Sequence, residues 1–65
     1  MNKLNLTWKD VFNCRKVFHL DFLECANVAD SVGYDYMCFN GKIHSTDSSP
    51  HEYVMLEEEL DSIKG

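Results

Sequence analysis

The chain contains three cysteines and three histidines, the side chains that most often bind zinc or act as nucleophiles and bases. In sequence order they are Cys14, His19, Cys25, Cys38, His44 and His51. A structural zinc site normally includes a Cys–Cys or His–His pair separated by only a few residues, and this sequence has no such pair. Cys14 and His19 come nearest to one. We therefore expect no metal site and no other cofactor.

A cysteine that contacts a histidine can carry nucleophilic catalysis, and two pairs are conceivable here, Cys38 with His44 and Cys14 with His19. The first pair needs both side chains on one face of a hairpin, whereas the expected strand pairing places them on opposite faces. A chain of 65 residues also has little room for a pocket that buries a ligand. Carboxylates cluster only in the run Glu57-Glu58-Glu59, where solvent would surround them. We expect the protein not to be an enzyme.

The net charge of −5 is carried entirely by the second half of the chain. Residues 1–32 hold four basic and four acidic side chains, whereas residues 33–65 hold two basic and seven acidic ones. An acidic surface repels phosphate backbones and favours a basic partner, such as the nucleic-acid-binding surface of another protein. The alternative is that the charge only keeps a small protein soluble.

The three cysteines are an odd number without a tight pairing pattern. We see no secretory signal and no apolar run of the length that a membrane helix needs. The sequence therefore predicts a cytoplasmic protein with reduced cysteines that fill its core. We expect one domain over residues 1–65, with residues 1–6 as a flexible lead-in. A chain this short buries only about 60% of its unfolded surface, so its core is marginal.

The strongest local signal is Asn40-Gly41, flanked by two short runs of aromatic and β-branched residues. A type I′ turn needs φ > 0 at both central residues, and Asn-Gly adopts it at the least cost. The turn fixes a register in which Phe39, Cys38, Met37 and Tyr36 pair in turn with Lys42, Ile43, His44 and Ser45. Alternation of side chains then places Tyr36, Cys38 and Ile43 on one face, which we expect to be core. The other face carries Met37, Phe39, Lys42 and His44.

Two helices are expected before the hairpin. Thr7 and Asp10 form a capping-box variant that predicts a helix from Trp8 to Val17. Asp21 and Glu24 form a second capping box, which predicts a helix from Phe22 to Val32. Gly33 follows as the left-handed residue that ends it.

A third helix is predicted after the hairpin, from Pro50 to Ile63, with Ser49 as its N-cap. The alternative is that Tyr53–Leu56 forms a third strand, with a shorter helix beginning at Glu57. The expected architecture is a small α+β domain of order α-α-β-β-α, in which a two-stranded antiparallel hairpin packs on the helices.

Binding is therefore a better hypothesis than catalysis. Two surfaces qualify: the acidic face of the last helix, and the second hairpin face if it is exposed. Their candidate contact residues are Met37, Phe39, Lys42, His44, Glu57, Glu58, Glu59 and Asp61. In style, though not in sequence, the chain resembles the small inhibitors of host enzymes made by phages and mobile elements. We predict an inhibitor or adaptor that occludes a basic surface of a host or cellular protein.

Two alternatives stay open. Two helices followed by a hairpin is the order of a winged helix-turn-helix, so a DNA-binding regulator is the second hypothesis. The exposed positions of the second helix are Glu24, Asn27, Asp30 and Ser31, which include no Arg or Lys, so we do not expect direct nucleic-acid binding. A homo-oligomer that completes its core between chains is the third hypothesis. We expect no membrane contact.

Overall fold

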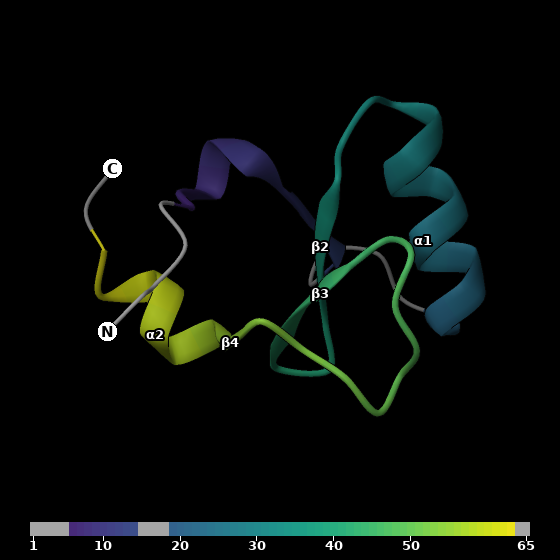
Figure 1. Ribbon diagram of the computed structural model, residues 1–65. Helices are drawn as coiled ribbons and strands as arrows, with labels where there is room; N and C mark the ends of the chain where they lie inside the picture. Colours follow the sequence, from purple (N-terminus) through teal and green to yellow (C-terminus); the bar gives the residue numbers. More distant parts are fainter. Residues whose placement is uncertain (1–5, 15–18, 64–65) are drawn as a thin grey trace.

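The computed structural model describes residues 6–14 and 19–63 of the chain. A mixed four-stranded sheet of order β1-β2-β3-β4 lies at its centre. The elements in chain order are η1 (Trp8–Asp10), β1 (Val11–Asn13), α1 (Phe22–Ser31), β2 (Tyr36–Phe39), β3 (Lys42–Ser45), β4 (Met55–Leu56) and α2 (Glu57–Asp61). α1 lies on one side of the sheet, and η1 and α2 lie on the other (Figure 1). The α+β class is confirmed, but the order of elements differs from α-α-β-β-α.

The hairpin has the predicted register. Tyr36, Met37, Cys38 and Phe39 pair with Ser45, His44, Ile43 and Lys42. Asn40 and Gly41 both have positive φ, at 54° and 82°, as a type I′ turn requires. The local chemistry of this turn therefore determines how β2 and β3 align.

α1 begins at Phe22, as its cap predicts, and ends at Ser31, one residue before the predicted end at Val32. The side chain of Asp21 accepts the backbone N–H of Glu24 at 2.9 Å, and Glu24 accepts the N–H of Asp21 at 3.0 Å. The two bonds satisfy N–H groups that have no partner within the first turn. Gly33 follows the helix with a φ of 92°, the left-handed conformation expected there.

The predicted helix from Trp8 to Val17 is wrong over the residues described. The capping box of Thr7 and Asp10 is present, but it starts only the single 3-10 turn η1. β1 follows and pairs in parallel with β2, with Val11 opposite Tyr36. Val and Phe favour strands, and pairing with β2 outweighs a helix start that only one cap supports. Residues 15–17 of the predicted helix lie outside the described part of the chain.

The predicted helix from Pro50 to Ile63 is also wrong. The alternative of a strand and a shorter helix from Glu57 is correct in part, because the strand covers Met55–Leu56 and not Tyr53 and Val54. The N–H of Val54 donates to the carbonyl of Ile43 at 2.8 Å, so this segment joins the sheet. Met55 is buried in the core, and β4 passes directly into α2. The β-propensity of Tyr53–Leu56 and a free edge on β3 together outweigh the cap signal at Ser49.

Two small cores lie on opposite faces of the sheet. The α2-side core contains the predicted inward residues Cys38 and Ile43, with Tyr36 packed against it. Its other buried members are Leu6, Val11, Met55 and Leu60. The α1-side core consists of Cys14, Cys25, Ala26, Ala29 and Met37, bordered by Phe12, Phe22, Tyr34 and Phe39. Both faces of β2 and β3 are therefore covered.

A disulfide joins Cys14 to Cys25. The prediction that all three cysteines are reduced is therefore wrong for this pair. Cys38 is a buried thiol on the other face of the sheet, where it belongs to the α2-side core. Within the described ranges, no helix is long and apolar enough to cross a bilayer.

The turn residue Gly41 provides a direct test of the hairpin. A Cβ at this position would meet no atom within 4 Å, so any cost of a side chain comes from the backbone alone. Gly41→Ala should lower the free energy of unfolding by about 1–2 kcal/mol, because a φ of 82° is strained for alanine. Gly41→Asn is the matched control and should cost less, since Asn tolerates this conformation. Urea unfolding measures both, and equal losses would contradict the turn assignment.

Candidate functional site

The second hairpin face is largely covered in the structure. Met37 is fully buried and His44 is 2% exposed, while Phe39 and Lys42 are half-buried. α1 covers this face: the ring of Phe22 lies 5.5 Å from that of Phe39 and 4.9 Å from that of His44. A partner could reach Met37 or His44 only if α1 moved. The predicted contact residues on this face are thus reduced to the parts of Phe39 and Lys42 that reach solvent.

His44 has a structural role that sequence reasoning missed. Its Nδ1 lies 2.6 Å from the backbone carbonyl oxygen of Glu52, so Nδ1 carries the hydrogen of this bond. The bond fastens the segment that precedes β4 to the middle of β3. No pattern in the sequence predicts this bond, because only the course of the loop between them brings His44 close to Glu52.

The four acidic residues predicted as a contact surface do lie together on α2, but three of them also stabilise the fold. Glu57 accepts a bond from the Cys38 thiol at 3.5 Å, Glu59 accepts the N–H of Leu56 at 3.0 Å, and Asp61 accepts the indole N–H of Trp8 at 3.1 Å. Glu57 to Glu59 also occupy the first turn of α2, where negative charge complements the helix dipole. Glu58 is exposed and takes no part in these bonds.

A shallow hollow of about 300 Å³ lies between α2 and the hairpin turn. Gly41, Leu56, Glu57, Glu58 and Asp61 line it. A hollow bordered by three carboxylates suits the ammonium or guanidinium group of a basic partner better than a neutral ligand.

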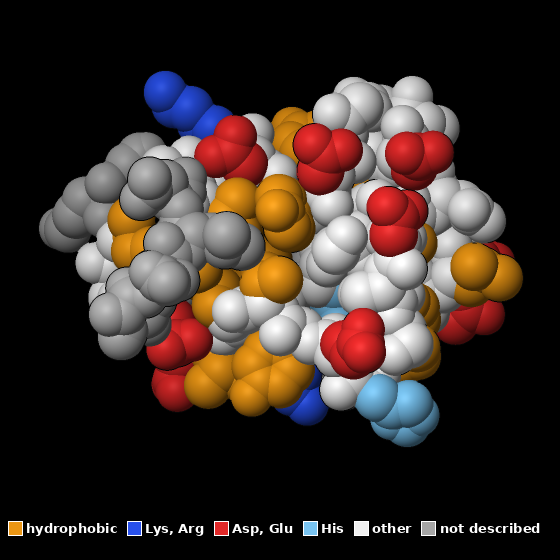
Figure 2. All heavy atoms as spheres, viewed as in Figure 1, with side chains coloured by type: hydrophobic (Ala, Val, Ile, Leu, Met, Phe, Trp, Pro, Cys, Tyr) orange, Lys and Arg blue, Asp and Glu red, His pale blue; other side chains and the backbone are white. Residues whose placement is uncertain are grey.

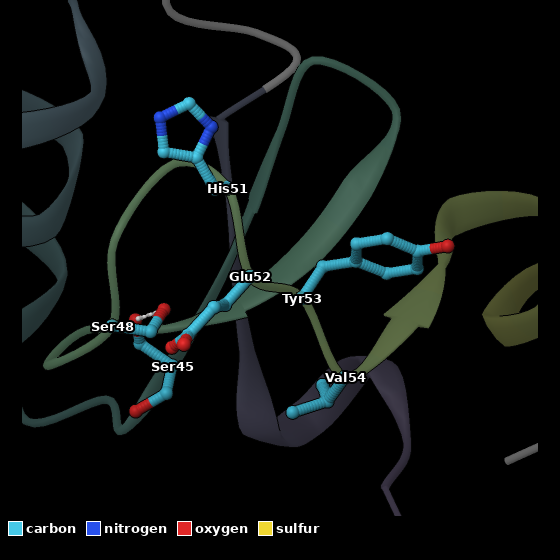
Figure 3. Close-up of a pocket in the computed structure, with 6 residues that line it drawn as sticks. All are labelled: Ser45, Ser48, His51, Glu52, Tyr53 and Val54. Carbon is cyan, nitrogen blue, oxygen red and sulfur yellow. Dashed lines mark hydrogen bonds between the residues drawn. The ribbon is translucent and has the colours of Figure 1, made fainter.

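A larger hollow of about 570 Å³ lies beside the segment that leads into β4. Ser45, Ser48, His51, Glu52, Tyr53 and Val54 line it (Figure 3). His51 and Tyr53 point in different directions there, and Glu52 extends toward the two serines (Figure 3). The Ser48 hydroxyl donates to the carbonyl of Ser45 at 2.8 Å, so it is used within the turn. The hollow does not place a serine beside a histidine.

Tyr53 and Val54 give this region an apolar element, since they are 49% and 40% exposed. The ammonium of Lys42 lies 5.4 Å from the centre of the Tyr53 ring, within the range of a cation–π contact. The predicted helix from Pro50 to Ile63 gave no indication that Tyr53 is exposed. The strand alternative did not indicate it either, because alternation places Tyr53 on the same face as Met55, which is buried.

Carboxylates cover the surface. All eleven acidic residues lie in the described ranges; ten of them are exposed and Glu57 is half-buried. Figure 2 shows acidic side chains distributed across the visible face, with few basic ones between them. Lys9 and Lys42 are the basic residues within the described ranges. The electrostatic field at this surface is therefore negative.

The cysteine and histidine side chains do not assemble into a metal centre in the part of the chain described. The sulfurs of Cys14 and Cys25 are joined to each other, which removes two of the candidate ligands. Among the described residues, no three His, Cys, Asp or Glu side chains are grouped so that they could hold a metal ion.

The sequence matches no protein-family model. Comparisons with curated proteins and with solved structures also found no significant match. The inferences about function below therefore rest on geometry and charge alone.

The distinction between structural and surface carboxylates can be tested on α2. Asp61→Ala should lower the free energy of unfolding by about 1 kcal/mol, because the Trp8 indole loses its acceptor. It should also alter the emission of Trp8, which is the only tryptophan. Glu58→Ala, the matched control, should change stability by less than about 0.5 kcal/mol. Equal effects of the two substitutions would show that the Trp8–Asp61 bond does not contribute.

Proposed function

We propose that this protein is a non-catalytic, acidic protein-binding module, an inhibitor or adaptor that covers a basic, nucleic-acid-binding surface of a host or cellular protein. The observation that carries the proposal is the exposure of ten of the eleven carboxylates on a domain of only 65 residues. Such a surface attracts basic patches over the Debye length and speeds association with them. By presenting negative charge as a phosphate backbone does, it competes with nucleic acid for the same patch.

The exposed residues of the C-terminal segment that fit this role best are Glu52, Tyr53, Val54, Glu58, Glu59 and Asp61, which we group under the name acidic face. It combines two exposed apolar side chains with four exposed carboxylates. An aromatic anchor surrounded by charges is typical of interface centres, where the anchor supplies affinity and the charges supply orientation and on-rate. This face replaces the hairpin face, whose central side chains α1 covers.

The structure offers less support for the alternative of a DNA-binding regulator. A winged helix-turn-helix needs a helix before the recognition helix, and Trp8–Asn13 instead forms η1 and β1. The exposed residues of α1 include Glu24 and Asp30 and no Arg or Lys. A negative surface of this kind opposes phosphate contacts.

The proposal predicts a charge-dependent association that localises to the acidic face. The double substitution Glu52→Gln and Glu58→Gln removes two charges from that face. It should lower the association rate with the partner on the order of threefold to tenfold at about 50 mM salt, and less at about 300 mM. The partner is first recovered on the immobilised chain from a lysate, and biolayer interferometry then measures the rates.

Asp30→Asn with Asp35→Asn is the matched control, because it makes the same change of charge at the end of α1 and in its connection to β2. This control should leave the rate within about twofold if contacts localise to the acidic face. Double-stranded DNA should displace the chain from its partner. Equal effects of the two double variants, or no displacement by DNA, would contradict the proposal, and a mobility shift of DNA by the chain alone would support the alternative.

A further inference from the structure

The Cys14–Cys25 disulfide joins the end of β1 to α1, two elements that both pack against β2. Cys14 directly follows β1, and Cys25 lies in the first half of α1. α1 packs mainly against β2, where the rings of Phe22 and Phe39 meet. The disulfide is therefore a covalent tether between the end of β1 and α1, in addition to the packing of Phe12 against the α1-side core.

Besides the disulfide, β1 is held by one short ladder and by the packing of Val11 and Phe12. It is three residues long and pairs in parallel with β2 alone among the strands described. Val11 is buried in the α2-side core, and the ring of Phe12 lies 5.9 Å from that of Tyr34. A short parallel ladder is weak without a covalent or packed support.

α1 and the hairpin, in contrast, hold together without the disulfide. Phe22 contacts both Phe39 and His44, and Ala29 and Met37 are fully buried between the helix and the sheet. The N–H of Tyr34 also donates to the carbonyl of Ala29 at 2.9 Å, which fixes the connection to β2.

The third cysteine cannot exchange with this disulfide in the folded chain. Cys38 pairs in register with Asn13, the neighbour of Cys14. However, Cys38 belongs to the α2-side core and Cys14 to the α1-side core, so the sheet separates their sulfurs. The only thiols that can reopen the disulfide come from outside the protein.

We propose that the Cys14–Cys25 disulfide is a redox switch that decides whether β1 is docked on the sheet. A thiolate of a dithiol reductant attacks Sγ of Cys14, because Cys14 as a residue keeps 8% exposure whereas Cys25 has none. The Cys14–Cys25 bond breaks, and Cys25 leaves as a thiolate that takes up a proton. The second thiol of the reductant then resolves the mixed disulfide, so that two electrons and two protons are transferred and the reductant becomes a disulfide.

Release of β1 would uncover the edge of β2. The N–H and C=O groups of Tyr36, Met37 and Cys38 that pair with β1 would lose their partners. Such an edge accepts an additional strand from another chain. The reduced and oxidised proteins would then present different surfaces.

Hydrogen exchange of the wild-type protein, oxidised or treated with dithiothreitol, tests the switch. On reduction, exchange should accelerate at least tenfold at the β1–β2 amides and less than twofold in α1 and the β2–β3 ladder. Reoxidation should restore protection. Unchanged exchange in β1, or loss of protection over the whole chain, would overturn the proposal, the second because the disulfide would then hold the entire fold.

Cysteine variants and a monothiol probe test the switch in two further ways. The double variant Cys14→Ser, Cys25→Ser should show the reduced pattern with or without dithiothreitol, while Cys38→Ser should respond like the wild type. With glutathione as a monothiol probe, the mixed disulfide should form at Cys14, and mass spectrometry locates it. Modification at Cys25 instead would contradict the assigned route of attack.

Discussion

The alternation of side chains along β2 and β3 is the constraint on which the rest of the structure depends. Because successive residues face opposite sides, the eight strand residues of the hairpin present two apolar faces, and each requires a cover. α1 covers one, and η1 with α2 covers the other (Figure 1). A chain of 65 residues thus builds two small cores and not one large one. Each core depends on the short elements that close it.

Because two cores must be closed by few residues, several side chains both stabilise the fold and lie on the surface. Glu59 caps α2 and Asp61 binds Trp8, yet both remain on the surface. Disulfide formation between Cys14 and Cys25 likewise fills the α1-side core while it ties β1 to α1. In a domain this small, the residues that could meet a partner are largely those that hold the chain together.

The parts of the fold that could be predicted are those that neighbouring residues determine. The turn at Asn40-Gly41 and the caps of α1 each involve atoms only a few residues apart, so their chemistry is visible in the sequence. β1 and β4 are three and two residues long, and neither exists without the strand beside it. Their formation depends on free edges of a hairpin that is distant in sequence, which outweighs the local helix signals at Thr7 and Ser49.

The same reasoning applies to the candidate site. The acidic character of α2 could be predicted because charge is a property of composition. The burial of Met37 and His44 could not, because it depends on where α1 lies against the sheet. The pairing of Cys14 with Cys25 could not be predicted either, because it depends on their proximity in the folded chain. The odd number of cysteines gave no indication of which two would pair.

The shortness of β4 has a consequence for the behaviour of the protein at high concentration. β4 is the outer strand of the sheet, and an exposed outer strand can pair with another copy and start aggregation. Here the strand stops after two residues, and the chain passes at once into Glu57-Glu58-Glu59. The N–H of Leu56 is already bonded to Glu59. The charges act as gatekeepers that repel a second sheet, so this edge favours a dispersed protein over edge-to-edge assemblies.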